Sequence, residues 1–150
     1  MEKLLSKAIT LALKAHEGQF DKSGMPYAGH IMRVMAAGRT IDEKIVGVLH
    51  DVVEDTDISC EVVRKEFGAD VCMLVEALTK LSNIPFVARE DVQAENIRKM
   101  LLAMNKDIRV IFIKLCDRLH NMRTLSAKKE DRQRAIALET MYIYAPLAHR

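Results

Sequence analysis

The chain has 150 residues, of which 49% are hydrophobic, so it has enough apolar surface for one domain with a single core, expected over residues 1–150. Its formal net charge of +2 argues against a nucleic-acid-binding domain, in which basic residues are concentrated on one surface. The three cysteines are odd in number and widely spaced, which argues against a disulfide framework or a cysteine zinc site and fits a reducing cytoplasm.

Helix-forming residues dominate the composition. Only 6 glycines and 3 prolines interrupt the sequence, which is typical of packed helices rather than of a sandwich or a barrel, so we expect an all-α fold. No apolar run approaches the ~20 residues that span a bilayer. The N-terminal lysines interleave with apolar residues, which is not the pattern of a signal peptide. We therefore expect no membrane partner.

The N-terminal part is predicted to contain two helices separated by a long loop. Residues 2–16 have apolar side chains at helical spacing. Residues 17–29 contain three glycines and a proline, and a loop of this length in a small domain is typical of a functional segment. A short helix is expected to open at His30 and to end at Gly38.

A third helix is predicted to begin near Ile41, because Thr40 and Glu43 have the spacing of a capping box. Apolar residues continue at helical spacing through the sequence VLHDVVEDT, residues 48–56, so we expect one unbroken helix here. This helix would carry four polar or acidic residues: His50, Asp51, Glu54 and Asp55.

Two further helices are expected to follow, one between Ser59 and Gly68 and one over residues 71–81. The amphipathic segment 91–104 predicts another helix, and Asp107 is a candidate cap for the next one. The run RVIFIKLC, residues 109–116, is rich in β-branched residues and could form a buried strand. We predict a buried helix instead, because a helical stripe extends past it: Ile108, Ile111, Phe112, Leu115, Leu119 and Met122.

A final helix is expected after Ser126, which is a candidate N-cap. Its spacing predicts that five residues face inward: Ala135, Leu138, Met141, Tyr142 and Ala145.

The first chemical signal is the pair His50 and Asp51, which offers a nitrogen and a carboxylate oxygen to a divalent cation. Such a pair on its own is more often the solvated end of an amphipathic helix. Glu54 and Asp55 follow one turn later, however, and three carboxylates within six residues repel one another unless a cation or arginines neutralise them. This crowding favours a metal site.

The second signal is Asp117, which follows a very apolar run that ends at Leu115 and shares a helical face with residues 121 and 124. An acid beside a buried stripe needs a partner, and an ion pair would satisfy it as well as a metal would. The candidate partners are Arg118, Arg123 and Lys114. His30 could likewise cap its helix or fill a polar position in the core instead of binding a metal.

Four stretches of the chain resemble, in order, the motifs of RelA/SpoT hydrolase domains, which are helical bundles of the HD type. They are AHEGQFDKSGMPYAGH (15–30), VLHDVVEDT (48–56), FGADVCMLVEALTKL (67–81) and QAENIRKMLLAMNKDIRVIFIKLCDRLHNMRTL (93–125). The resemblance covers nearly the whole chain and is far more specific than any dipeptide. The synthetase and regulatory domains of long members have no counterpart here, so we expect a small stand-alone hydrolase or a truncated piece.

The resemblance implies a metal-dependent phosphohydrolase that removes the 3′-pyrophosphate from (p)ppGpp, a guanine nucleotide substrate. It implies one divalent metal ion, usually manganese. The implied metal ligands are His30, His50, Asp51 and Asp117. The implied water-activating acids are Glu54 and Asp55. The implied nucleotide pocket contains Lys22, Ser23, Asn121 and Thr124, with Arg123 as an addition.

Two positions depart from the family pattern. Asp21 stands where members typically have arginine, so an anion replaces a cation beside the expected nucleotide site. Ile31 follows His30 where members tend to have proline, which should alter the start of the helix. These departures leave two alternatives open, an NADPH phosphatase and a non-catalytic nucleotide or metal sensor. A helical interaction module is a third alternative, but it leaves the resemblance unexplained.

Overall fold

The computed structural model describes residues 2–84, 94–95, 97–98, 100–102, 105 and 107–149. Within them every named element is helical and no strand occurs, which confirms the all-α fold. The first helices are α1 (Glu2–Ala15), α2 (Ala28–Ala37), α3 (Ile41–Leu49), α4 (Val52–Asp55), α5 (Cys60–Phe67) and α6 (Ala69–Ser82). The later ones are α8 (Ile108–Arg123), the 3₁₀ helix η1 (Leu125–Ala127), α9 (Glu130–Glu139), the π-helix η2 (Thr140–Tyr144) and α10 (Ala145–His149).

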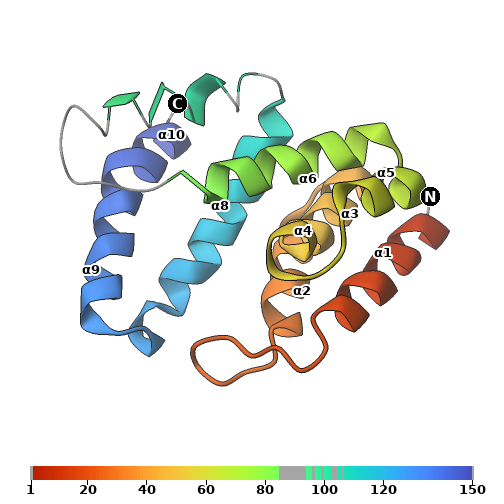
Figure 1. Cartoon of the computed structure of the whole chain (residues 1–150). Helices are drawn as coiled ribbons and strands as arrows, with labels where there is room; N and C mark the ends of the chain where they lie inside the picture. Colours follow the sequence, from red (N-terminus) through yellow and green to blue (C-terminus); the bar gives the residue numbers. More distant parts are fainter. Residues whose placement is uncertain are drawn as a thin grey trace.

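Helix α8 crosses the middle of the molecule between two groups of helices (Figure 1). On one side it contacts α2, α3 and α6, and these pack in turn with α1 and α5. On the other side it contacts η2, which leads from α9 into α10. A side chain that points from α8 toward α2 and α3 therefore meets residues from the first third of the chain.

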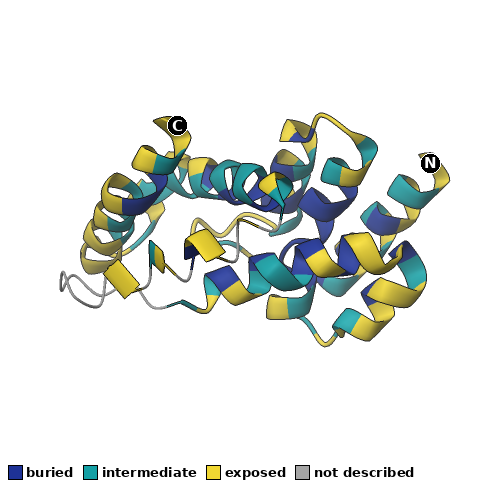
Figure 2. Cartoon of the chain, turned by 90° about the horizontal axis from the view of Figure 1, so that it is seen from above, coloured by how far each residue is buried: buried dark blue, intermediate teal, exposed yellow. Residues whose placement is uncertain are grey.

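The hydrophobic core lies among α1, α2, α3, α6 and α8, where Figure 2 shows buried faces turned toward one another. Fully burying an aliphatic side chain stabilises a fold by roughly 1.5–3 kcal/mol. The largest fully buried side chains of the core are Ile31, Ile45, Leu49, Leu74 and Ile113.

Gly47 allows α3 to approach α2 closely. A Cβ atom at this position would lie only 3.1 Å from the Cα atom of Met35 and from the carbonyl oxygen of Val34, which is tighter than most Cβ contacts in proteins. This close approach brings His30, in the first turn of α2, near the end of α3.

Several predicted helix starts are confirmed. Thr40 and Glu43 form the capping box of α3, and the Ser59 side chain caps α5. Asp107 caps α8, and residues 109–116 lie inside this helix rather than in a strand. Helix α2 begins at Ala28, two residues before the expected start at His30. Half of the expected helix over 91–104 lies outside the described residues.

The predicted continuous helix through residues 48–56 is wrong. Helix α3 ends at Leu49, His50 and Asp51 form a turn, and α4 begins at Val52. The Nδ1 atom of His50 lies 2.7 Å from the carbonyl oxygen of Gly47. This oxygen is the one that the Asp51 N–H would use if the helix continued, so the side chain competes with the backbone for it.

The predicted inward face of α8 is partly wrong. Ile108 and Leu119 are 78% and 51% exposed. The buried residues of this helix are Val110 and Ile113 and three polar residues, Lys114, Asp117 and His120. The C-terminal half of α8 thus buries polar side chains in place of the expected apolar ones.

The last part of the chain also differs from the prediction. Ser126 lies inside η1, and α9 begins at Glu130 after Lys129. The π-helix η2 then shifts the periodicity, because its turns are wider than those of an α-helix. As a result Ile143 and Tyr144 are buried. The five residues expected to face inward are all exposed: Ala135, Leu138, Met141, Tyr142 and Ala145.

The three cysteines carry free thiols. No helix within the described residues is long and apolar enough to cross a bilayer.

Candidate metal centre

Four predicted residues from three parts of the chain meet in the interior. His30 comes from the first turn of α2, His50 and Asp51 from the turn after α3, and Asp117 from the middle of α8, and all four are buried. The Nε2 atoms of His30 and His50 are 3.3 Å apart. Asp117 Oδ1 lies 3.2 Å from His30 Nε2, and Asp51 Oδ2 lies 2.8 Å from His50 Nε2.

This donor set fits a divalent metal ion. Ligand atoms of His30, His50 and Asp117 all lie within 4.8 Å of one another. Asp51 adds a second carboxylate, since its Oδ2 also lies 3.5 Å from His30 Nε2. Two imidazole nitrogens with carboxylate oxygens suit a borderline or hard divalent cation.

The electrostatics of the cluster favour a positive charge at its centre. Burial lowers the pKa of His50, but the facing carboxylates of Asp51 and Asp117 outweigh it and raise this pKa to about 10. Burial acts in the opposite direction on the two acids, yet the two histidines hold both carboxyl pKa values well below their usual range. Both acids are therefore ionised at neutral pH, and a divalent cation would supply the charge that protonated imidazole supplies without it.

The second nitrogen of each histidine is already bonded away from the cluster. His50 Nδ1 contacts the carbonyl oxygen of Gly47, and His30 Nδ1 lies 2.5 Å from the Nδ1 of His120. A proton on Nδ1 leaves the Nε2 lone pair free, which is how metal-binding histidines are commonly oriented. His120 was missed by sequence reasoning, because no local pattern connects it to His30.

The two aspartates are also held by neighbours. Lys114 Nζ lies 3.2 Å from Asp117 Oδ2, and the Asn121 amide donates a 3.0 Å hydrogen bond to Asp117 Oδ1. Of the three ion-pair partners considered for Asp117, the structure thus brings Lys114 to it, whereas Arg118 pairs with Glu139. The ion pair and the cluster coexist, because each uses a different oxygen of the carboxylate.

Glu54 and Asp55 line a cleft of about 400 Å³ that opens beside the cluster. Burial and the charge of Asp51 raise the pKa of both carboxyl groups. A carboxylate with a raised pKa holds a proton more readily near neutral pH, which suits a general base. The cleft volume lies within the usual range for small-molecule sites.

The predicted pocket residues are distributed over two adjoining hollows. Lys22, Asn121 and Thr124 line the 400 Å³ cleft. Ser23 lines a second hollow of about 290 Å³, which shares Thr124 with the first. Arg123 is exposed and lines neither of them.

Two cations that sequence reasoning missed line the same cleft as the acids. Lys128 and Arg132 line it together with Lys22, and none of the three forms an ion pair with a residue that the structure describes. Burial, with repulsion from Lys22 and Arg132, lowers the pKa of Lys128. Only the spacing of Lys128 and Arg132, four residues apart, hinted at a shared face.

Asp21 lines both hollows, but its carboxylate is hydrogen-bonded to the backbone of its own loop. Its Oδ1 accepts hydrogen bonds of 2.8 and 3.0 Å from the backbone N–H groups of Ser23 and Met25. This arrangement is an Asx-type turn, which an arginine could not form. The departure from the family pattern therefore changes how the loop is built as well as its charge.

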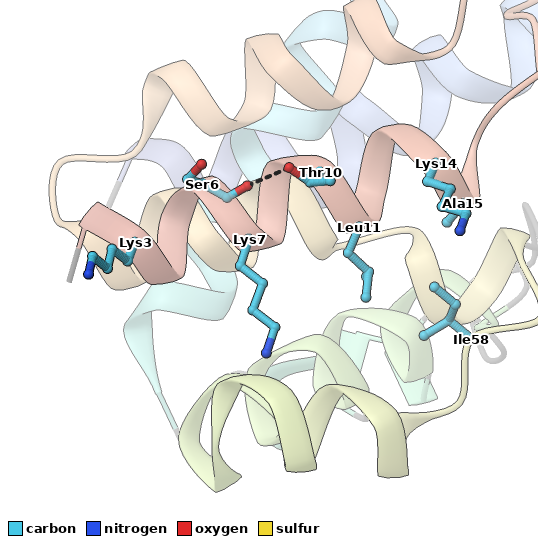
Figure 3. Close-up of a pocket in the computed structure, with 8 residues that line it drawn as sticks. All are labelled: Lys3, Ser6, Lys7, Thr10, Leu11, Lys14, Ala15 and Ile58. Carbon is cyan, nitrogen blue, oxygen red and sulfur yellow. Dashed lines mark hydrogen bonds between the residues drawn. The ribbon is translucent and has the colours of Figure 1, made fainter.

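A larger hollow of about 770 Å³ lies between α1 and the segment that contains Ile58 (Figure 3). It contains no histidine, aspartate or glutamate, and its Lys7 is paired with Glu66. Acid–base or metal chemistry therefore belongs to the smaller cleft. The lining residues of the larger hollow are Lys3, Ser6, Lys7, Thr10, Leu11, Lys14, Ala15 and Ile58.

Comparison with known proteins agrees with this geometry. The model of a family described as "HD domain" matches residues 8–150, and the chain belongs to this family. Membership implies a divalent metal ion. The chain is also similar, at 30% identity and a TM-score of 0.67, to a solved structure described as a metazoan orthologue of SpoT that hydrolyses ppGpp and plays a role in starvation responses. That similarity covers 87% of this chain and 77% of the other.

The chain is also similar in sequence to curated relatives. The chain is 49% identical over 144 residues to the guanosine-3′,5′-bis(diphosphate) 3′-pyrophosphohydrolase of Haemophilus influenzae, covering 93% of this chain and 21% of the relative. It is 51% identical over 151 residues to a probable enzyme of that name from Synechocystis, covering 98% and 20%. The resemblance to RelA/SpoT hydrolase domains is confirmed, and the chain spans about one fifth of these relatives.

Proposed function

We propose that this chain is a metal-dependent phosphohydrolase that removes the 3′-pyrophosphate from guanosine 3′,5′-bis(diphosphate) and its pentaphosphate analogue. The observation that carries the proposal is the polarity of the cleft. The cleft is lined by His30, Asp51 and Asp117 of the buried cluster, by two further acids, and by three cations that form no ion pair with a described residue. The names of the curated relatives, at 49% and 51% identity, support the substrate.

The metal ligands in this proposal are His30, His50, Asp51 and Asp117, and manganese is the proposed ion. A bound divalent ion supplies a Lewis acid that polarises phosphoryl oxygens and lowers the pKa of water. The burial of all four side chains supports this assignment, because buried carboxylates in such proximity need a cation. Lys114 and Asn121 hold Asp117 in its orientation.

Glu54 and Asp55 act in this proposal as the acids that orient the attacking water and take its proton. Their position in the cleft, rather than in the buried cluster, leaves both carboxylates accessible to substrate and water. A positioned general base contributes about 10²–10⁴-fold to the rate.

The three cations Lys22, Lys128 and Arg132 bind phosphate groups in this proposal. Unpaired positive charges that repel one another in a cleft are stabilised by a polyanion. Thr124 lines both hollows and Ser23 lines the smaller one, and both are proposed to contact the nucleotide. Arg123 has no position in either hollow that supports a contact.

We further propose that residues 1–150 form one domain, that a guanine nucleotide is its partner, and that it acts in the cytoplasm. The contacts of α8 with both groups of helices support a single folding unit.

The test is an anion-exchange assay of the purified chain with Mn²⁺, guanosine 3′,5′-bis(diphosphate) and, in parallel, NADPH and GTP. We expect pyrophosphate and a guanosine 5′-diphosphate product from the first substrate only. Phosphate release from NADPH would identify the related phosphatase instead. Nucleotide binding by calorimetry without any product would identify a sensor.

A further inference from the structure

Tyr27 precedes α2 and lines the cleft, and the roles proposed so far do not use it. Its hydroxyl lies 2.6 Å from Asp51 Oδ2 and 3.4 Å from Asp55 Oδ2. One phenol thus stands between a proposed metal ligand and a proposed base. We propose that Tyr27 is a positioning residue, which holds the Asp51 carboxylate in its ligating orientation and separates it from the Asp55 carboxylate. This inference rests on the proposed function.

The two distances decide where the single phenol proton lies. A separation of 2.6 Å is typical of a strong hydrogen bond from a hydroxyl to a charged carboxylate, so Tyr27 donates to Asp51. At 3.4 Å the contact with Asp55 is too long to compete for the same proton. The Asp55 carboxylate therefore remains free to accept a proton from water in the cleft.

The oxygen that Tyr27 holds is the one that faces the cluster. Asp51 Oδ2 lies 2.8 Å from His50 Nε2 and 3.5 Å from His30 Nε2. A carboxylate rotates easily about its terminal torsion, which has broad minima. The phenol hydrogen bond restricts this rotation before any metal arrives, and such outer contacts commonly preserve metal affinity.

The ring of Tyr27 is itself fixed by its surroundings. Its centroid lies 5.0 Å from the ring of His16 and 5.3 Å from the ring of His30. Its backbone N–H donates a 3.0 Å hydrogen bond to the carbonyl oxygen of Gln19. None of these contacts uses the hydroxyl, so phenylalanine would keep the packing and remove only the hydrogen bond to Asp51.

The variant Tyr27→Phe tests this inference, with Tyr142→Phe as a matched control that removes an exposed hydroxyl outside the cleft. The first measurement is a calorimetric titration of the full chain with Mn²⁺ alone. We expect about 10-fold weaker affinity or more for Tyr27→Phe, as for other outer contacts of metal ligands. The control should match the wild type, and the melting temperature of all metal-free proteins should be the same.

The second measurement is the steady-state kinetics with guanosine 3′,5′-bis(diphosphate) at saturating Mn²⁺. We expect kcat of Tyr27→Phe to fall roughly 10- to 100-fold with KM within about twofold, because positioning affects the reaction rather than nucleotide binding. A tyrosine that only packs would leave both constants and the metal affinity unchanged.

The outcomes separate the two proposals. Equal Mn²⁺ affinity in wild type and Tyr27→Phe overturns the positioning role, and so does an affinity lost only together with a lowered melting temperature. A wild type that binds Mn²⁺ without releasing pyrophosphate overturns the proposed function, while the titration still decides the role of Tyr27. A wild type that binds no Mn²⁺ overturns both.

Discussion

The Nδ1 atom of His30 lies 2.5 Å from the Nδ1 atom of His120, so an imidazole from α8 supports an imidazole from α2. This contact leaves the Nε2 atom of His30 facing His50 and Asp117. The two residues are 90 positions apart in the sequence, and the bond between them exists only because α2 and α8 pack together.

The first prediction concerns this support. His120→Ala should weaken Mn²⁺ binding roughly 10- to 100-fold, because His30 loses the partner that fixes its ring and its tautomer. His149→Ala is the control, since His149 is exposed in α10. The measurement is calorimetric titration with Mn²⁺. An affinity equal to that of the wild type would mean that His120 does not orient the ligand.

The second prediction concerns the ligands themselves. His50→Ala and Asp117→Asn should each abolish stoichiometric metal, because the first removes a nitrogen donor and the second replaces an anionic oxygen donor with a weaker, neutral one. Asparagine is chosen because Lys114 is buried against Asp117, and an alanine would leave this cation with only its hydrogen bond to Ser82. Elemental analysis of the purified proteins checks it, with Asp131→Asn as an exposed control. Full metal content in both variants contradicts the assignment.

The third prediction separates catalysis from binding. Glu54→Gln and Asp55→Asn should leave Mn²⁺ and nucleotide affinity nearly unchanged, because each amide keeps its size and some hydrogen bonding. Turnover should fall by about 10²-fold or more, which is the usual contribution of a general base. The exposed Asp57→Asn variant is the control. Pyrophosphate release at the wild-type rate by both amide variants would rule out their role as water-activating acids.

The fourth prediction concerns the loop departure. Asp21→Asn should lower KM for guanosine 3′,5′-bis(diphosphate), because it removes a negative charge beside the cleft. The amide oxygen can still accept the hydrogen bonds from Ser23 and Met25 that build the turn. Steady-state kinetics at low ionic strength provide the test, since screening weakens the effect. A KM that stays the same or rises shows that this position does not govern substrate affinity.

The fifth prediction concerns stability. Asp107→Ala should reduce the free energy of unfolding by about 1–2 kcal/mol, because Asp107 caps α8 by accepting the Arg109 N–H. Asp107→Ser keeps a cap but loses the ion pair to Arg109, so it should lose less. Urea unfolding measures both. Equal losses in the two variants would assign the effect to the ion pair.

The same residue gives a pH dependence with a defined sign. The hydrogen bond from Arg109 holds the pKa of Asp107 below its usual value. A lowered carboxyl pKa means that the stabilisation is complete at neutral pH and is lost as the pH falls through the lowered pKa. The difference between wild type and Asp107→Ser in urea should therefore shrink in acid, and a constant difference contradicts the role of the charge.

The sequence by itself determined the helical fold, most helix boundaries and the family. Helical spacing and caps are local features, so residues within one turn predicted them, as at Thr40 and Glu43. The grouping of His50 and Asp51 with Glu54 and Asp55 was visible for the same reason. Local spacing failed where a side chain competed with the backbone, as His50 does at Gly47, and where a π-helix shifted the periodicity.

Only the tertiary structure decided which residues surround the candidate ligands. Tyr27, Lys114 and His120 contact them, and Lys128 and Arg132 line the adjoining cleft. Tyr27 precedes α2, Lys114 and His120 lie in α8, and Lys128 and Arg132 lie just before and within α9. Their proximity follows from close packing of α2, α3 and α8 around a shared core, and a single sequence contains no local periodicity that records a contact between distant helices.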